Sequence, residues 1–529
     1  MAAIALKRES FVHDLKVSGR PAPLTGQPKR KLTSSDSIFW LVLVSAAFLA
    51  AELTPALLRM PLGADEITYI ARSSAHASAI SLPPVHGQGM GLMAAPVTLL
   101  TTSLTAIRIW MSVLSAVGLF LAVLCWRGLR PMWVLALAEL VLASLAITQN
   151  SGVQIYPDWW GALCLLALTG LFLKAVNGTI RARVVLPLIG FVSLVIVLLR
   201  PQNVVFLMGP VILACLVVRR WRNFRMLAAM AVGTALGFAE WVAGAYLWFG
   251  GLTERINLAG QEPPPLHLYF ALLTQVRYMN GSWYCSTGCS QWAVPAETPW
   301  WIAFLAIAVL GLWAGWHRSS MKASSVLAGA SALWVFLFYA FLVPFGAPRY
   351  LLPTYALMSI LVADGIVWAV TESRWRKFSE SRWRKLVAAA ACLFLLGGIA
   401  SQRVILQHQA AYQAVTRQFQ AEAQELEKIG VHPPCVLDNT SIAYYLGCSA
   451  PWTTTGPDIQ TVTAFLQNRT PQGLKYWRML PLPPPPKPGD FLPVVFLPAT
   501  SPVFRSAQSI AHAKAEFAHI DKAFNISGS

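Results

Sequence analysis

Two adjacent carboxylates, Asp65 and Glu66, follow the first long apolar segment of the chain. Ionised groups beside hydrocarbon are costly to solvate, so in a membrane protein they usually line a wet site that handles substrate, ions or protons. A third acid, Asp158, opens a later apolar segment, and Arg200 and Arg349 lie at the ends of two more. A carboxylate can take a proton from a hydroxyl, and a guanidinium fork can hold a phosphate. These residue types therefore indicate chemistry between a hydroxyl acceptor and a phosphate-bearing lipid.

The elements that must position these side chains are membrane spans. The chain is 56% hydrophobic and 12% charged, with a mean hydropathy of +0.54 over 529 residues. A helix that crosses the hydrocarbon core needs roughly 20 apolar residues. We therefore expect an all-α polytopic membrane protein of eleven spans, at about 38–58, 105–126, 131–149, 158–174, 184–200, 203–218, 226–250, 299–316, 323–344, 351–370 and 386–402.

The distribution of Lys and Arg predicts the orientation of these spans, because cytoplasmic loops retain positive charge. The six segments on one side of the predicted spans carry 24 Lys and Arg, whereas the segments on the other side carry six. The N-terminus is therefore expected in the cytoplasm and the tail outside, in a multi-pass cell-membrane protein of the bacterial inner-membrane type. Residues 65, 66, 158, 200 and 349 then share the outer side. The net charge of +18 follows from topology and lipid contacts, and nucleic-acid binding is not expected.

Three domains are expected along the chain. Residues 1–36 are polar and basic and predict a disordered cytosolic arm, 37–402 form the membrane domain, and 403–529 form a small α/β domain on the extracytoplasmic face. In the tail, the residues from Pro434 predict a strand, a turn at Asp438 and a helix start, and 491–497 predict a second strand. This domain is expected to pack as a lid or to present the acceptor, without catalytic residues of its own.

Four cysteines fall in segments assigned to the outside: Cys285, Cys289, Cys435 and Cys448. An oxidising exterior would let them form disulfides, although the sequence does not decide the pairing. Zinc bound by Cys285 and Cys289 is a minor alternative, because no histidine pair accompanies them.

The acidic pair Asp65-Glu66, the Pro-Asp sequence at Asp158 and the Arg-Tyr-Leu-Leu-Pro sequence from Arg349 resemble motifs of a known superfamily. They are similar to those of the GT-C integral membrane glycosyltransferases, in the branch that contains the protein O-mannosyltransferases and the lipid A aminoarabinose transferase. The resemblance covers roughly residues 38 to 450. It implies a GT-C-like fold and the inverting transfer of a sugar from a polyprenyl-phosphate carrier to a lipid, glycan or protein acceptor on the outer face.

The resemblance also implies roles for individual residues. Asp65 would be the general base, Glu66 would share or orient that role, and Asp158 would position the acceptor or the sugar. Arg349 and Arg200 would neutralise the phosphate leaving group. Two further residues are candidate substrate contacts: Tyr350, which follows Arg349, and His86, which lies in the same predicted outer loop as Asp65 and Glu66. No cofactor is certain, and a divalent cation (Mg²⁺ or Mn²⁺) stays open because diphosphate donors often need one.

Two alternatives use the same residues. A flippase or transporter of a lipid-linked sugar would use the carboxylates for proton coupling, but it predicts symmetric halves and broken helices near the midplane. The acids of this chain lie instead at span ends. A ligase or polymerase that uses a polyprenyl-diphosphate glycan donor would differ only in the donor that it consumes.

Overall fold

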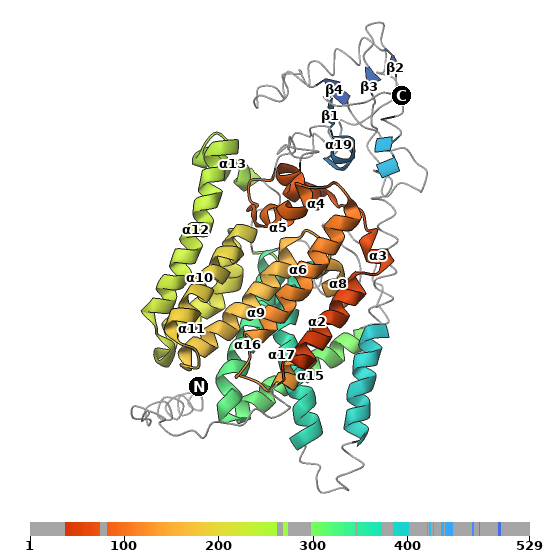
Figure 1. Ribbon diagram of the computed structural model, residues 1–529. Helices are drawn as coiled ribbons and strands as arrows, with labels where there is room; N and C mark the ends of the chain where they lie inside the picture. The colour runs from red at the N-terminus through yellow and green to blue at the C-terminus, as the bar shows by residue number, and fades with distance from the viewer. Residues whose placement is uncertain are drawn as a thin grey trace.

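The computed structural model describes residues 37–74, 82–261, 268–272, 298–343, 347–372 and 385–400, with shorter stretches between 420 and 498. The first half is helical (Figure 1), with elements α2 (Phe39–Glu52), α3 (Pro55–Leu58), α4 (Ala64–Ile70), η2 (Ala71–Ser73), α5 (Gly89–Thr98), α6 (Leu104–Leu124), α7 (Met132–Ala143), α8 (Ala146–Gly152), α9 (Pro157–Val176), α10 (Ala182–Leu199), η3 (Val204–Met208), α11 (Gly209–Val217), η4 (Arg219–Trp221), α12 (Phe224–Trp248) and α13 (Leu252–Gln261). The later elements are α15 (Thr298–His317), α16 (Ser319–Leu342), η5 (Pro348–Leu351), α17 (Leu352–Glu372), β1 (Cys435–Leu437), α19 (Thr440–Leu446), β2 (Asn468–Arg469), β3 (Lys475–Tyr476) and β4 (Phe496–Pro498).

Seven helices within the described part of the chain are long and apolar enough to cross a membrane, and each matches one expected span. They are α6, α9, α10, α12, α15, α16 and the helix that begins with η5 and continues as α17. The expected span 131–149 is instead a pair of helices, α7 and α8, bent by 81°.

The other three expected spans correspond to shorter apolar helices, at Phe39–Glu52, Val204–Val217 and Lys385–Ala400. Hydropathy measures apolar length along the sequence, and it does not register where a helix begins or ends. The count of eleven spans therefore stays a prediction. An additional short apolar helix that was not expected, α5, contains Pro96 and lies between α4 and α6.

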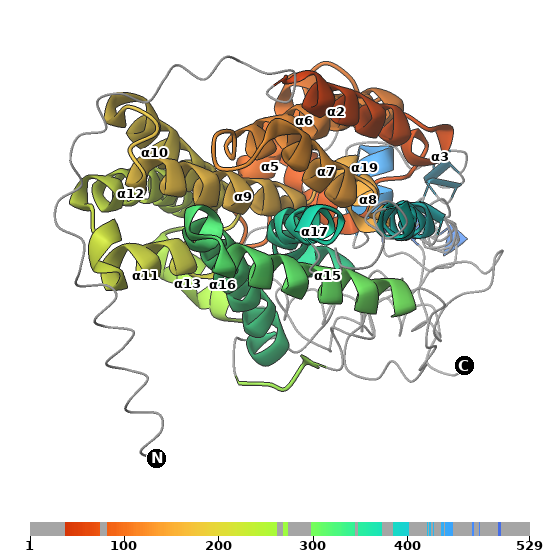
Figure 2. The ribbon, with the colours of Figure 1, turned by 90° about the horizontal axis from the view of Figure 1, so that it is seen from below.

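Helices α9 and α17 occupy the centre of the bundle. Viewed from below, they lie between α2 and α6 on one side and α15 and α16 on the other (Figure 2). Most of each helix is buried in protein, 83% in both cases, whereas only 22% of α12 is buried. Asp158 is in the first turn of α9, and Arg349 is in η5, which leads directly into α17. The best-packed elements of the fold therefore position two of the expected site residues.

Close helix contacts depend on glycine at two crossings. A Cβ on Gly233 of α12 would meet the carbonyl oxygen of Gly190 in α10, and a Cβ on Gly311 of α15 would meet that of Leu361 in α17. Small residues let helix backbones approach closely in membrane proteins. The two glycines thereby let α12 pack closely on α10 and α15 pack closely on the central helix α17.

The far end of α17 from Arg349 is fixed by a buried ion pair. Arg130, just before α7, donates from Nη2 to Asp364 Oδ2 at 2.9 Å and from Nε to both carboxylate oxygens. Its Nη1 and Nη2 also donate to the hydroxyls of Ser324 and Ser325 in α16. Asp364 is thus part of a structural contact that joins α7, α16 and α17.

The tail contains the expected strand and helix in sequence order, and the turn expected at Asp438 lies outside the described residues. Strand β1 pairs antiparallel with β4, with Cys435 opposite Pro498, and α19 follows β1. Strands β2 and β3 form a second antiparallel pair. Figure 1 shows these strands and α19 beyond the end of the bundle where α4 and α5 lie. The domain boundaries, including the arm 1–36 and the outer domain 403–529, stay predictions.

Candidate functional site

The two adjacent acids lie in the first turn of the short helix α4. Gly63 precedes the helix in an extended conformation, and its N–H donates to Glu66 Oε2 at 2.9 Å. A carboxylate at this position satisfies a backbone donor that the helix itself leaves unpaired, and it interacts favourably with the helix dipole. Glu66 is therefore part of the helix start.

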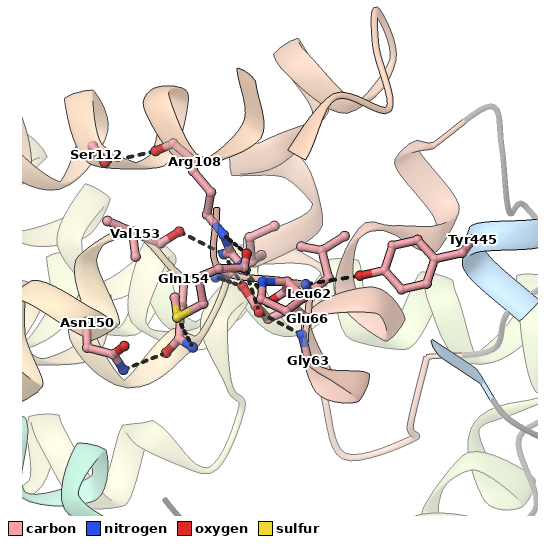
Figure 3. Close-up of polar contacts among 12 residues, drawn as sticks. Leu62, Gly63, Glu66, Arg108, Ser112, Asn150, Val153, Gln154 and Tyr445 are labelled. Atoms are coloured by element: carbon pink, nitrogen blue, oxygen red, sulfur yellow. Dashed lines mark hydrogen bonds and ion pairs between the residues drawn. The ribbon is translucent and has the colours of Figure 1, made fainter. Parts of the chain in front are cut away.

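Glu66 is also bound to Arg108 of α6, in a pair with no exposure to solvent (Figure 3). Its Oε1 and Oε2 accept from Arg108 Nη1 and Nη2 at 2.5 and 2.9 Å, and Oε1 accepts from the N–H of Ile155 at 2.8 Å. The remaining donors of Arg108 bind the backbone carbonyls of Met60, Pro61 and Val153.

A general base needs a lone pair that can reach the proton of its substrate. Both oxygens of Glu66 accept two hydrogen bonds each, and the side chain is 0% exposed. Of the two roles expected for Glu66, this geometry fits the orienting one, because the pair joins α4 to α6 and to the segment that leads into α9.

Asp65 points to a different partner. Its side chain is 53% exposed, and Oδ2 lies 3.3 Å from Nη2 of Arg349. Its backbone carbonyl accepts from the hydroxyl of Thr68 at 2.7 Å within the same helix. Asp65 is therefore a carboxylate held at one side by a guanidinium and open at the other.

Arg349 joins Asp65 to the buried acid Asp158. Nε of Arg349 lies 3.3 Å from Asp158 Oδ2, and Nη1 of Arg200 donates to Asp158 Oδ1 at 3.0 Å. The four charged side chains form a row in the order Asp65, Arg349, Asp158 and Arg200. Only the first is substantially exposed, since the side chain of Asp158 is 5% exposed and that of Arg200 14%.

Helix ends bring this row together. Asp158 is in the first turn of α9 with Pro157 at its start, Arg349 is in η5 ahead of α17, and Arg200 follows α10 in an extended conformation. Proline is well suited to the first position of a helix because it lacks the N–H that would remain unpaired there. Three of the membrane helices therefore contribute one charged side chain each at the same end of the bundle.

Tyrosine rings support Arg349. Its guanidinium carbon lies 4.2 Å from the ring centre of Tyr156 and 5.5 Å from that of Tyr350. The ring of Tyr350 stacks in turn on Tyr339 of α16, with centroids 5.2 Å apart. Cation–π contacts of this kind orient a guanidinium without neutralising it. Tyr350 was expected to contact substrate, and its observed neighbours are Arg349 and Tyr339.

His86 lies against Tyr69 of α4, with ring centroids 5.0 Å apart. Burial lowers the pKa of His86 well below its ordinary value, and the positive charges of Arg200, Arg349 and Arg255 lower it further. The imidazole is therefore neutral at physiological pH. Its Nδ1 is buried and has no hydrogen-bond partner among the residues that the structure describes.

Arg255 of α13 fixes the loop that carries His86. It donates from Nε to the carbonyl of Pro84 at 3.0 Å and from Nη2 to that of His86 at 2.8 Å. Its guanidinium lies 4.3 Å from the ring of Trp241 and 4.7 Å from that of Phe249. Arg255 is 1% exposed, so it contributes to the position of the loop rather than to a surface.

The structure thus gathers Asp65, Asp158, Arg200, Arg349 and Tyr350 in one cluster, with His86 beside it. The pattern did not predict that Arg108 and Arg255 hold the loops of this site. The sequence did carry a signal for Arg108, because an ionisable residue inside an apolar span usually faces the interior of the helix bundle and pairs with another polar group there.

A divalent cation does not fit the carboxylates as they are placed. Asp65 and Asp158 share the guanidinium of Arg349, which a cation bridging them would have to displace. Among the described residues, no group of three or more His, Cys, Asp or Glu side chains converges. The predicted disulfides and the zinc alternative involve Cys285, Cys289 and Cys448, which lie outside the described residues, and Cys435, whose side chain is not described.

The chain shares its overall fold with ArnT, a member of the superfamily whose motifs the sequence resembles. The chain is similar to ArnT from Cupriavidus metallidurans bound to undecaprenyl phosphate, with a TM-score of 0.52 and 15% identity over 78% of this chain and 86% of that one. The apo form of ArnT gives a TM-score of 0.52 and 14% identity, over 78% of this chain and 85% of that one. For the apo oligosaccharyltransferase of Archaeoglobus fulgidus, the TM-score is 0.45 and the identity is 11%, over 79% of this chain and 61% of that one.

No family profile matches the sequence, and no curated protein matches it. At identities of 14–15% the likeness to ArnT concerns the fold. The activity has to be argued from the site.

Proposed function

We propose that this protein is an inverting glycosyltransferase that moves a sugar from a polyprenyl-phosphate carrier to a hydroxyl acceptor on the extracytoplasmic face. One observation carries the proposal: Asp65 is a half-exposed carboxylate at the end of a row whose other members, Arg349, Asp158 and Arg200, are largely buried. An open base at one end of a row that contains two guanidiniums suits a reaction that removes a proton from a hydroxyl and releases a phosphate.

In the proposed reaction, Asp65 takes the proton of the acceptor hydroxyl while the acceptor oxygen bonds to the anomeric carbon. The bond from that carbon to the phosphate oxygen breaks on the opposite face, and the electron pair leaves with the phosphate. Arg349 and Arg200 stabilise the negative charge that develops there. The carboxylate loses one negative charge as the phosphate gains one, so the net charge of the site does not change.

Asp158 is assigned the role of holding the two arginines in place. It accepts from Arg200 at one oxygen and is paired with Arg349 at the other. With Asp158 between them, two positive charges can lie close together in a buried site without a net repulsion. Two residues, Arg349 and Asp158, also separate the base from Arg200, as a displacement requires when acceptor and leaving group occupy opposite faces of a sugar.

A lipid-linked donor is supported by the location of the site and by the fold. The arginines lie at the ends of membrane helices, where the phosphate of a lipid whose chain is in the bilayer would be found. The related fold of ArnT has been solved with undecaprenyl phosphate. The sugar and the acceptor (lipid, glycan or protein) are left to experiment.

The test is a donor panel assay. The purified protein in lipid nanodiscs is incubated with polyprenyl-phosphate sugars and, in a second set, with polyprenyl-diphosphate glycans, and release of the polyprenyl phosphate or diphosphate is measured. Release from a monophosphate donor that depends on Asp65 is the expected result. Release from diphosphate donors alone would replace the proposal by a ligase or polymerase, and transport without bond cleavage would replace it by a flippase.

A further inference from the structure

Helix α19 of the C-terminal part lies directly on α4, the helix that carries the proposed base (Figure 1). Three of its side chains are almost completely buried, with Ile442 and Ala443 at 0% exposure and Tyr444 at 2%. The contact joins segments separated by almost the whole membrane domain, so it does not follow from chain connectivity.

Tyr445 contacts the backbone just ahead of α4. Its phenolic oxygen accepts from the N–H of Leu62 at 3.2 Å (Figure 3), and Leu62 is followed by Gly63, the residue that precedes the helix. Leu62 is 1% exposed, and a buried backbone N–H needs a partner. Burial raises the pKa of Tyr445 to about 12, so the phenol is neutral at physiological pH.

The neighbouring Tyr444 packs against Tyr445. The two rings contact each other edge to face, with centroids 5.7 Å apart. Burial raises the pKa of Tyr444, so this phenol is also neutral at physiological pH. The tyrosine pair thus belongs to the helix that contacts α4.

A helix as short as α4, with seven residues, is not stable by itself and depends on its tertiary contacts. On the inner side these contacts are the Glu66–Arg108 pair. On the outer side they are those of α19. Asp65 lies in the first turn between the two, and a base acts only from within hydrogen-bond reach of its proton.

We propose that α19 is a positioning element of the active site, with Tyr445 as its positioning residue. The C-terminal part of the chain then determines the position of the Asp65 carboxylate. This inference rests on the proposed function for its effect on catalysis, but not for its effect on the structure of α4. The substrate contacts remain those of the membrane domain.

The experiment compares the full-length protein with the Tyr445→Phe variant, which removes only the hydroxyl. Hydrogen exchange of the peptides that cover residues 62–74 is measured in nanodiscs, together with kcat and the donor KM. The expected result is faster exchange in this segment and a kcat reduced about tenfold, because small displacements of a catalytic group are costly, with an unchanged KM for the donor. Tyr246→Phe is the matched control, since Tyr246 of α12 is 67% exposed, and neither quantity should change in it.

The thermal unfolding midpoint separates positioning from general destabilisation. Tyr445→Phe keeps the ring and its packing, so the midpoint should stay close to that of the wild type while exchange of residues 62–74 rises and kcat falls. Unchanged exchange, or faster exchange with an unchanged kcat, would overturn the inference. If the wild-type protein transfers no sugar from any donor, the proposed function fails, whereas the exchange measurement still decides whether α19 holds α4.

Discussion

Asp65 and Arg349 form an ion pair between residues 284 positions apart in the chain, with Oδ2 and Nη2 separated by 3.3 Å, while the carboxylate stays half exposed. The guanidinium holds the carboxylate from one side. The exposed half leaves room for an acceptor hydroxyl. This pairing distinguishes Asp65 from Glu66, its neighbour in the sequence.

Replacement of Asp65 by Asn is expected to abolish most of the transfer activity. A positioned general base contributes about 10²- to 10⁴-fold to a rate, and the amide cannot accept the proton. Because Asp65 is exposed, the variant should fold normally, as judged by size-exclusion chromatography and thermal unfolding. Glu254→Gln is the control, since it changes another exposed acid, in α13. Turnover of Asp65→Asn at the wild-type rate would remove Asp65 from the role of base.

Replacement of Arg349 by Lys keeps the charge but loses the fork that reaches both Asp65 and Asp158. We expect kcat to fall about 10²-fold, because the donors aimed at the developing phosphate charge are no longer pre-organised. Single-turnover release of polyprenyl phosphate measures this effect. Arg219→Lys, in the exposed segment η4, should leave the rate unchanged. An Arg349→Lys enzyme with wild-type kcat would show that phosphate stabilisation lies elsewhere.

Replacement of Glu66 by Gln is expected to act on stability first. The change leaves Arg108 as a buried charge without its carboxylate, and breaking a buried ion pair by removing one partner costs about 3–5 kcal/mol. The variant should therefore unfold at a lower temperature or a lower denaturant concentration than the wild type in detergent. Glu254→Gln, on the surface, should leave the unfolding midpoint in place. A variant with wild-type stability would contradict the structural role of the pair.

His86 predicts a dependence of stability on pH. Its pKa in the folded protein lies below the ordinary value, so below about pH 6.5 the unfolded chain binds a proton there and the folded protein does not. The unfolded state then binds more protons, and stability falls as the pH decreases from 7 to 5. In His86→Gln this part of the decrease should disappear. The measurement is the unfolding midpoint of both proteins over that range, and parallel curves would show that His86 does not contribute.

Several elements were predictable from local pattern. The spans expected at 158–174 and 351–370 correspond to α9 (Pro157–Val176) and α17 (Leu352–Glu372), because long apolar runs with proline near their start define helices in a membrane protein. The tail strand and helix at Cys435–Leu437 and Thr440–Leu446 follow from β-branched residues, a polar turn and a helix start. The 81° bend between α7 and α8 was not predictable. In the expected span 131–149, the apolar composition continues across the bend.

The convergence of the site was partly predictable. Positive charge in alternating loops put Asp65, Asp158, Arg200 and Arg349 on one side, and the structure brings them into one row. The contact between Tyr445 and Leu62 had no local signal, because a tyrosine beside apolar residues is compatible with many kinds of packing.

The sequence by itself determined the membrane class, the main helices and the four charged residues at their ends, because these depend on apolar length and on the type of each side chain. Only the tertiary structure decided which of the two adjacent acids is open. Successive side chains of an α-helix point about 100° apart, so Asp65 and Glu66 face different neighbours. Arg108 binds and buries Glu66, whereas Arg349 contacts Asp65 from one side and leaves it accessible.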